Sequence, residues 1–228
     1  IKNFLSNILT MLNRNFLSDI DRKSAGKILD IGCGNGDLLN KLKDPNWEKT
    51  GIEIDENARK EAYNNKIQVI EGGYRVLEDI DEKFDVIIVS HVLEHVYDPK
   101  NLIRLAIKAL NKDGEIWFQW PNPESELLKV YKHFWRGLEA PRHICLMSKK
   151  SFTNIINSQL FKGKVILKDC SDRYPKSLIY MNLSSQSIKK GDKGYFSKSQ
   201  QILEYIKFYL MRTKTKNSEF CTFVVKKI

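Results

Sequence analysis

A glycine-rich stretch directly follows a short apolar run in KILDIGCGNGDLL, residues 27–39. Gly32, Gly34 and Gly36 provide positions where positive φ costs little and where a ligand can approach the main chain. The helix expected next offers unpaired N–H groups in its first turn. Dinucleotide-binding proteins use a related loop with the spacing GxGxxG, but here the third glycine comes one position early and Asp37 takes its place. This spacing disfavours a pyrophosphate ligand, and with it a nicotinamide dehydrogenase.

Two carboxylates accompany this loop. Asp30 ends the apolar run, where it would repel a pyrophosphate but suits an ammonium group. Glu53 ends the next expected strand, GIEID. In a doubly wound sheet the ends of the first two strands are neighbours, so Glu53 should face the loop across the ligand crevice and accept hydrogen bonds from both hydroxyls of a ribose. The pattern therefore predicts a nucleoside with a cationic, amino-acid-like end.

Aromatic and basic side chains alternate in an irregular stretch from residue 121 to 147. Such a mixture suits a partly apolar pocket with anion-binding groups, in which Arg142 would be a fork-like phosphate ligand. Nucleic-acid sites use the same mixture, so RNA remains open as a partner, although no stretch resembles an appended RNA-binding module. The substrate-binding candidates are Trp120, Tyr131, Trp135 and Arg142.

Elements that could position these residues alternate along the chain, because short β-rich runs are separated by amphipathic helical patterns, which indicates parallel strands joined by crossover helices. The expected strands are 27–31, 49–55, 67–72, 84–90, 115–120, 164–170 and 220–227, the last as an edge strand. The expected helices are 1–17, 36–43, 56–65, 99–110, 152–160 and 200–211, and Asp113-Gly114 should end the fourth of these.

The length of 228 residues suits a single domain, and 42% hydrophobic with 29% charged residues is ordinary for a globular protein. No apolar run approaches the roughly 18 residues of a membrane span. We divide the chain into an N-terminal helix (1–24), a ligand-binding core (25–120), a lid insertion over the substrate (121–147) and the second half of the sheet (148–228).

The net charge of +10 attracts anionic partners, although many of the lysines lie in polar C-terminal stretches and favour a solvated surface. The four cysteines are scattered without a CxxC pair, and the N-terminal residues show no secretion signal, so we expect a cytoplasmic protein without disulfides or zinc. No carboxylate and histidine cluster in the sequence requires a metal.

Four stretches in order, ILDIGCGNG, GIEID, FDVIIVSHVLEHVYDP and ALNKDGEIWFQWPN, resemble the successive motifs of class I S-adenosylmethionine-dependent methyltransferases over residues 25–122. WRGLEAPRHICLMSKKSFTNII resembles the type 23 methyltransferase-domain subgroup, which occurs among bacterial surface-polysaccharide and small-metabolite enzymes. The resemblance implies S-adenosylmethionine as cofactor, S-adenosylhomocysteine as product, and an α/β fold. That fold is a Rossmann-like doubly wound seven-stranded sheet, mostly parallel with an antiparallel C-terminal edge strand and helices on both faces.

The resemblance also implies a place for each cofactor-binding candidate. Glu53 would hold the ribose hydroxyls and Ile54 would pack on adenine. Where the family often has an acidic residue after the third strand, EGGYR has Gly73 and Tyr74, so this adenine contact would come from backbone or from the Tyr74 ring. The candidates for the methionine portion and the sulfonium centre are Asp30, Gly32, Cys33, Gly34, Ser90 and His91.

Methyl transfer to a hydroxyl needs a base to remove its proton, and histidine is the usual one. His143, in the PRH stretch that overhangs the methyl end in such folds, is the first candidate for base or acceptor-orienting group, and His91 is the second. The same PRH stretch could instead brace the lid against the sheet. Glu94 and His95 indicate a buried hydrogen-bonded pair that shapes the turn after the fourth strand.

The sequence leaves the methyl acceptor open. We expect an anionic small molecule, namely a phosphorylated or nucleotide-linked sugar or a surface-polysaccharide precursor. The alternatives are RNA, or a quinone or lipid that the N-terminal helix would reach at a membrane surface. A binding protein that kept the fold but lost the transferase activity is a further alternative, but the shared presence of Asp30, the loop glycines and Glu53 argues against it.

Overall fold

A computed structural model of the chain describes residues 16–169, 175–191, 197, 199–200, 203 and 219–228. The helix expected at residues 1–17 lies outside the described residues except at its end, where α2 (Phe16–Ile20) begins. The helix expected at 200–211 also lies almost entirely outside them.

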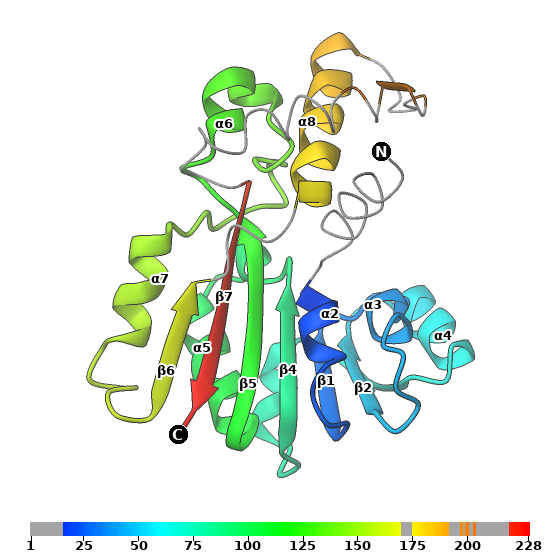
Figure 1. The fold of residues 1–228 in the computed structure, drawn as a ribbon, viewed down its shortest axis with the longest axis vertical. Coiled ribbons are helices and arrows are strands. Elements are labelled where there is room, and N and C mark those ends of the chain that lie inside the picture. The colour runs from blue at the N-terminus through cyan, green and yellow to red at the C-terminus, as the bar shows by residue number, and fades with distance from the viewer. Residues whose placement is uncertain (1–15, 170–174, 192–196, 198, 201–202, 204–218) are drawn as a thin grey trace, which may run out of the picture.

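A seven-stranded sheet with the order β3-β2-β1-β4-β5-β7-β6 forms the centre of the molecule (Figure 1). Its parallel pairs confirm the doubly wound sheet that the sequence predicts, with order reversal between β1 and β4. The strands are β1 (Lys27–Ile31), β2 (Glu48–Glu53), β3 (Gln68–Glu71), β4 (Phe84–Ser90), β5 (Leu110–Pro121), β6 (Val165–Asp169) and β7 (Phe220–Lys227).

The prediction that the C-terminal strand lies at the edge is wrong. β7 is antiparallel, as expected, but it pairs with β5 on one side and with β6 on the other, so β6 is the edge strand. Residues 220–225 are all buried, which requires cover on both faces of the strand. The alternation of residues along β7 cannot reveal whether β7 lies at the edge of the sheet, because its second neighbour, β6, belongs to a distant part of the sequence.

Helices cover both faces of the sheet, and alternate residues of each strand serve the two cores. Leu29 of β1 belongs to a core cluster that includes residues of α5 and α7, whereas its neighbour Ile28 belongs to a second cluster that includes residues of α2, α3 and α4. The helices are α3 (Asp37–Asn40), α4 (Glu56–Asn64), α5 (Pro99–Ala109), α6 (Glu126–Tyr131), α7 (Lys149–Ile156) and α8 (Pro175–Lys190).

Helix termini follow the sequence signals in part. Asp55 accepts a hydrogen bond from Ala58 N and caps α4, while Asp98 caps α5 through Asn101 N. α5 ends at Ala109, before the expected Asp113-Gly114 stop, because β5 begins at Leu110. Among the described helices, none is both long and apolar enough to cross a membrane.

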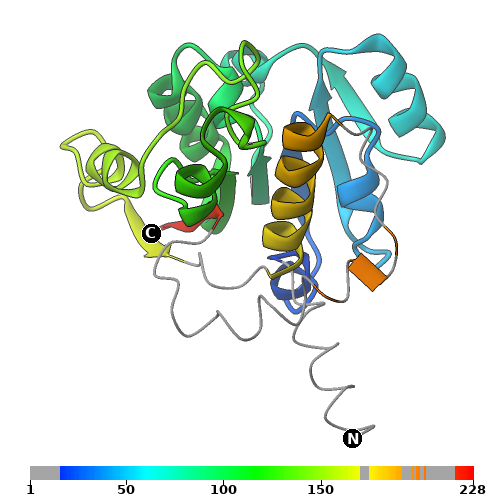
Figure 2. The same ribbon diagram turned by 90° about the horizontal axis from the view of Figure 1, so that it is seen from above.

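The lid insertion lies beyond the carboxyl ends of the parallel strands, together with α8, which the sequence did not predict (Figures 1 and 2). The phenol of Tyr131 donates to Asn182 Oδ1 of α8 at 2.7 Å, and Arg136 N donates to Ser185 Oγ at 3.0 Å. These contacts hold α6 and α8 side by side above the sheet. The segment expected to be irregular therefore contains helices and packs against α8 beyond the carboxyl ends of the parallel strands.

Candidate functional site

The glycine loop joins β1 to α3 at this same edge of the sheet. Gly32, Gly34 and Gly36 have φ angles of 74°, 54° and 80°, which confirms that all three need the left-handed region. A Cβ on Gly36 would lie 2.9 Å from Ile67 Cγ1, so this glycine serves close helix packing. A Cβ on Gly34 would meet nothing within 4 Å. Gly34 is therefore the place where the loop backbone is open to a ligand.

Glu53 faces the loop across the boundary between β1 and β2. Its Oε2 accepts a hydrogen bond of 2.8 Å from Gly34 N, and its Oε1 accepts from the backbone N–H groups of Ile54 and Asp55 at 2.8 and 2.9 Å. The carboxylate is thus fixed in orientation by the main chain. Oε2, which accepts a single hydrogen bond, retains acceptor capacity for a further donor such as a ribose hydroxyl.

Asp30 lies in β1, two residues before Gly32, with a relative exposure of 3%. Burial, and next the negative charge of Glu53, raise the pKa of its carboxyl from an ordinary 3.8 to about 8. Two carboxylates that share a poorly solvated site favour a cation between or beside them. The electrostatics therefore fit a ligand with an ammonium or sulfonium group.

Cofactor binding should depend on pH through Asp30. Because its pKa in the free protein is raised, Asp30 holds a proton near neutrality, and a bound ammonium group would displace that proton. We expect the affinity for S-adenosylhomocysteine to rise by up to about tenfold per pH unit as the pH increases toward 8, and then to level off. The raised pKa also affects stability. Asp30 ionises near pH 3.8 in the unfolded chain but only near pH 8 in the folded protein, so the free energy of unfolding should fall as the pH rises from about 4 to about 8.

Calorimetry in buffers of different ionisation enthalpy would measure both the affinity and the proton released. Asp30→Asn should bind more weakly at pH 8 and lose the pH dependence that the wild type shows. An affinity of the wild type that stays constant between about pH 6 and 8 would contradict this account.

The region expected to receive adenine carries an exposed apolar side chain. Ile54 is 72% exposed, and its Cδ1 lies 3.5 Å from the position of a Cβ on Gly73. Tyr74 begins a short 3-10 helix, Tyr74–Glu78, and its phenol donates to Asp98 O at 3.4 Å. A flat apolar ligand against Ile54 would remove this exposed surface from water.

Cys33 is a packing residue. Its side chain is buried, and burial, followed by the charges of Asp30 and Glu53, raises the pKa of its thiol to about 12. A Cβ on Gly51 would lie 2.3 Å from Cys33 Sγ, so Gly51 makes room for this sulfur. The thiol is therefore unreactive near neutrality. The backbone N–H of Cys33 donates to Ile52 O, and its carbonyl accepts from Gly36 N.

His91 follows β4 directly after Ser90 and combines strain with hydrogen bonding. Its φ of 56° is uncommon for a residue with a side chain, and such strain is concentrated at functional sites. Its Nδ1 lies 3.1 Å from Oε1 of Glu94, whose side chain is fully buried. The ring is 41% exposed and makes an edge contact with Phe220. His91 is thus accessible and fixed in orientation, as a base must be.

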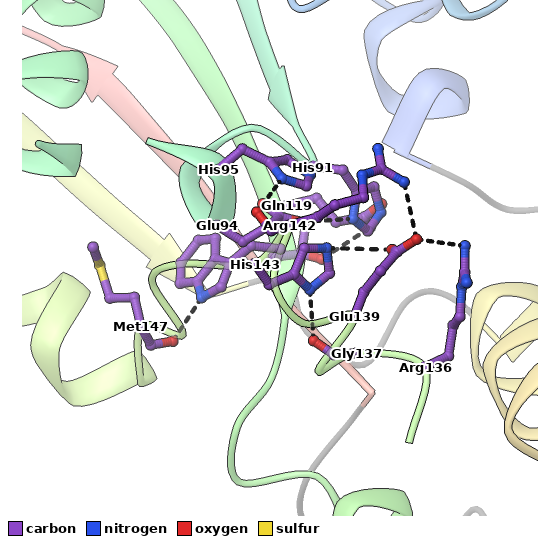
Figure 3. Close-up of polar contacts among 12 residues, drawn as sticks. His91, Glu94, His95, Gln119, Arg136, Gly137, Glu139, Arg142, His143 and Met147 are labelled. Carbon is purple, nitrogen blue, oxygen red and sulfur yellow. Dashed lines mark hydrogen bonds and ion pairs between the residues drawn. The ribbon is translucent and has the colours of Figure 1, made fainter. Parts of the chain in front are cut away.

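The turn and the lid meet at a second group of side chains (Figure 3). His95 Nδ1 lies 2.9 Å from Arg142 O, and His143 Nδ1 lies 2.7 Å from Gly137 O. The rings of His95 and His143 are 4.8 Å apart in an edge contact. Glu94 O accepts from Ile144 N and Cys145 N, which joins the lid backbone to the turn.

The comparisons with known proteins agree with this site. A family model described as a methyltransferase domain, type 23, matches residues 7–159, well over half of the chain. This chain belongs to the type 23 methyltransferase-domain family. The residues around the glycine loop fit S-adenosylmethionine, the cofactor of such methyltransferases. The buried Asp30 and the partly buried Glu53 form no ion pair with a cationic side chain in the described part of the chain, and Gly34 leaves the loop open.

Curated relatives share part of this methyltransferase domain. The ubiquinone biosynthesis O-methyltransferase of Actinobacillus pleuropneumoniae serotype 5b is 34% identical over 139 residues, which cover 53% of this chain and 57% of that protein. The protein of the same name from Idiomarina loihiensis is 30% identical over 128 residues, 52% of this chain and 49% of that protein. The chain spans about half the length of the curated relatives it matches.

Solved structures share the fold of the methyltransferase domain. The plantazolicin methyltransferase BamL, crystallised with a substrate analogue and S-adenosylhomocysteine, superposes with a TM-score of 0.63 at 16% identity, covering 96% of this chain and 84% of that one. An S-adenosylmethionine-dependent methyltransferase from Archaeoglobus fulgidus superposes with a TM-score of 0.59 at 19% identity, covering 93% of both chains.

Two predicted substrate-binding residues of the methyltransferase domain are buried and do not line an acceptor pocket in this structure. Trp120 is fully buried against Phe152 and Phe223, and its indole N–H donates to Met147 O at 2.7 Å. Trp135 is 1% exposed and donates to the carboxylate of Glu219. Packing of both indoles in the protein interior, with their N–H groups satisfied, removes them from contact with a substrate.

The candidate base His143 is also more enclosed than the sequence suggested. Its side chain is only 6% exposed, and its Nε2 lies 3.5 Å from Glu139 Oε2. Arg142, the expected phosphate ligand, is 68% exposed and pairs with Glu139 Oε1 at 2.9 Å, and Arg136 pairs with the same oxygen at 2.8 Å. These contacts favour His91 over His143 as the base, and they reduce the positive charge that an anionic acceptor would meet.

Proposed function

We propose that this methyltransferase domain transfers a methyl group from S-adenosylmethionine to a hydroxyl group of a small organic molecule, with a quinone precursor as the acceptor class. The observation that carries the proposal is the Asp30, Glu53 and Gly34 crevice, with His91 and Glu94 at the end of β4 nearby. The names of the curated relatives support the acceptor class. The pairing of Arg136 and Arg142 with Glu139 speaks against the phosphorylated sugar that the sequence favoured.

The residues of the crevice divide the cofactor between them in this proposal. Glu53 accepts hydrogen bonds from the ribose hydroxyls, Asp30 balances the ammonium group, and Ile54 covers one face of adenine. The backbone of Gly73 and the ring of Tyr74 border the adenine edge. The backbones of Gly32, Cys33 and Gly34 lie along the methionine portion, and Ser90 and His91 border the methyl group.

When bound, S-adenosylmethionine supplies an electrophilic methyl group, so the protein's task is to position the acceptor and to remove its proton. The Nδ1–H of His91 donates to Oε1 of the buried Glu94, which leaves the lone pair on Nε2. Nε2 then takes the proton of the acceptor hydroxyl, and Glu94 stabilises the imidazolium that forms. Tyr131, held by Asn182, remains the candidate for a lid contact with the acceptor.

Transfer of a labelled methyl group to a panel of acceptors tests this proposal. The panel contains a hydroxylated quinone precursor, a nucleotide-linked sugar, a small amine and RNA. Label on the hydroxyl oxygen of the quinone precursor is the expected result. Label found on the sugar, the amine or the RNA would refute the acceptor class, and binding of the cofactor without any transfer would identify a binding protein instead.

A further inference from the structure

We propose that Glu94, His95 and His143 bind a divalent transition-metal ion at the junction of the lid and the sheet. Glu94 and His95 belong to the short 3-10 helix Leu93–His95 after β4, and His143 comes from the lid. One potential ligand atom of each side chain lies within 4.8 Å of those of the other two. The sequence alone does not reveal this group, because His143 lies far from Glu94 and His95 along the chain.

The protein holds the three side chains in position through its main chain (Figure 3). Ile144 N and Cys145 N donate to Glu94 O at 2.8 and 3.1 Å, which fixes the residues after His143 against the turn. Ligand atoms about 2.1 Å from a tetrahedral ion lie roughly 3.4 Å from one another. Side-chain adjustments of about an ångström would therefore complete a coordination sphere.

Hydrogen bonds select the tautomer that metal binding needs. A backbone carbonyl only accepts, so the contacts of His95 Nδ1 with Arg142 O and of His143 Nδ1 with Gly137 O require a proton on each Nδ1. In its neutral form each ring then carries its lone pair on Nε2, and that of His143 also faces Glu139 Oε2 at 3.5 Å. Metal-binding histidines typically have this second hydrogen bond, which orients the ring and fixes the ligating nitrogen.

Glu94 supplies the negative charge and an oxygen without a partner. Its side chain is fully buried, and Oε1 is taken by His91 Nδ1 at 3.1 Å. Oε2 is buried and has no hydrogen-bond partner in the described part of the chain. Buried carboxylate oxygens are normally satisfied by a donor or a cation, so this atom points to a ligand that the protein itself does not provide.

Two imidazoles and a carboxylate favour zinc or a neighbouring transition metal over Mg²⁺ or Ca²⁺, which take oxygen ligands. Three protein ligands leave a position open for water or for an acceptor oxygen. Since Glu94 also contacts His91, that position would lie next to the proposed base.

A titration of the full chain with Zn²⁺ by calorimetry, and with Co²⁺ by visible absorption, tests the site without any methyl transfer. We expect one ion per chain, and an affinity weakened by at least about 10–100-fold in His95→Gln and in Glu94→Gln. His133→Gln is the matched control, because His133 is exposed and lies outside the cluster. Its affinity should equal that of the wild type.

Crystals of the wild type soaked in Zn²⁺ provide a readout that does not depend on the folding of any variant. An anomalous peak between Glu94, His95 and His143 would support the site. Peaks only at other positions, no saturable binding by the wild type, or unchanged affinity in both ligand variants would overturn it. Ion binding in a chain that methylates no acceptor would leave the site standing and contradict only the proposed function.

Discussion

Replacing Glu53 by alanine is expected to weaken the binding of S-adenosylmethionine and S-adenosylhomocysteine by about 2–4 kcal/mol, roughly 30-fold or more. The variant removes the carboxylate that we assign to both ribose hydroxyls. It also removes the acceptor of three backbone N–H groups, those of Gly34, Ile54 and Asp55, which donate to Glu53 in the wild type. The ligand itself would then have to order the loop. Loss of contact and loss of preorganisation act in the same direction.

Calorimetry measures this loss, with Glu56→Ala as the matched control. Glu56 is a glutamate three positions further on, exposed on α4 and paired only with Lys60 among the described ion pairs. The control should bind both ligands as tightly as the wild type. Retention of wild-type affinity in Glu53→Ala would show that the ribose assignment is wrong.

Replacing His91 by alanine is expected to lower kcat by about 10²–10⁴-fold on a hydroxyl acceptor, the usual contribution of a positioned general base. The affinity for S-adenosylhomocysteine should change little, because the ring is not assigned to the nucleoside. Removal of the ring also leaves Oε1 of the buried Glu94 without its partner, so the free energy of unfolding should fall by about 1–3 kcal/mol.

Three measurements separate catalysis from structure in this variant. Single-turnover rates report the chemical step, calorimetry reports cofactor binding, and thermal unfolding reports stability. His91→Gln should preserve most of the stability without restoring the rate, because an amide can contact Glu94 but cannot take a proton near neutrality. Full activity in both variants would exclude His91 as the base and return His143 to consideration.

The geometry of the glycine loop and its contact with Glu53 were predictable because their signals are local. Strand periodicity, three closely spaced glycines and the glutamate that ends the second strand lie within one βαβ unit. In a parallel sheet, chain order then places the strand ends together, so the contact between Glu53 and Gly34 follows from the sequence. The φ angles of the glycines confirm the tight turn.

The acceptor side was not predictable, because it depends on contacts between distant segments. Trp120 and Trp135 resembled pocket-lining residues by type, but β7 and Glu219, from the end of the chain, enclose them. The same insertion of β7 between β5 and β6 moved the expected edge strand inward. His143 likewise lies close to Glu94 and His95 only because the lid packs against the turn that follows β4.

A crystal structure of the chain with S-adenosylhomocysteine would show where each part of the nucleoside binds. We expect the ribose hydroxyls on the carboxylate of Glu53, the ammonium group beside Asp30, adenine against Ile54, and the amino-acid portion along Gly34. A nucleoside that lies elsewhere, or one in this crevice with its ribose turned away from Glu53, would contradict this expectation.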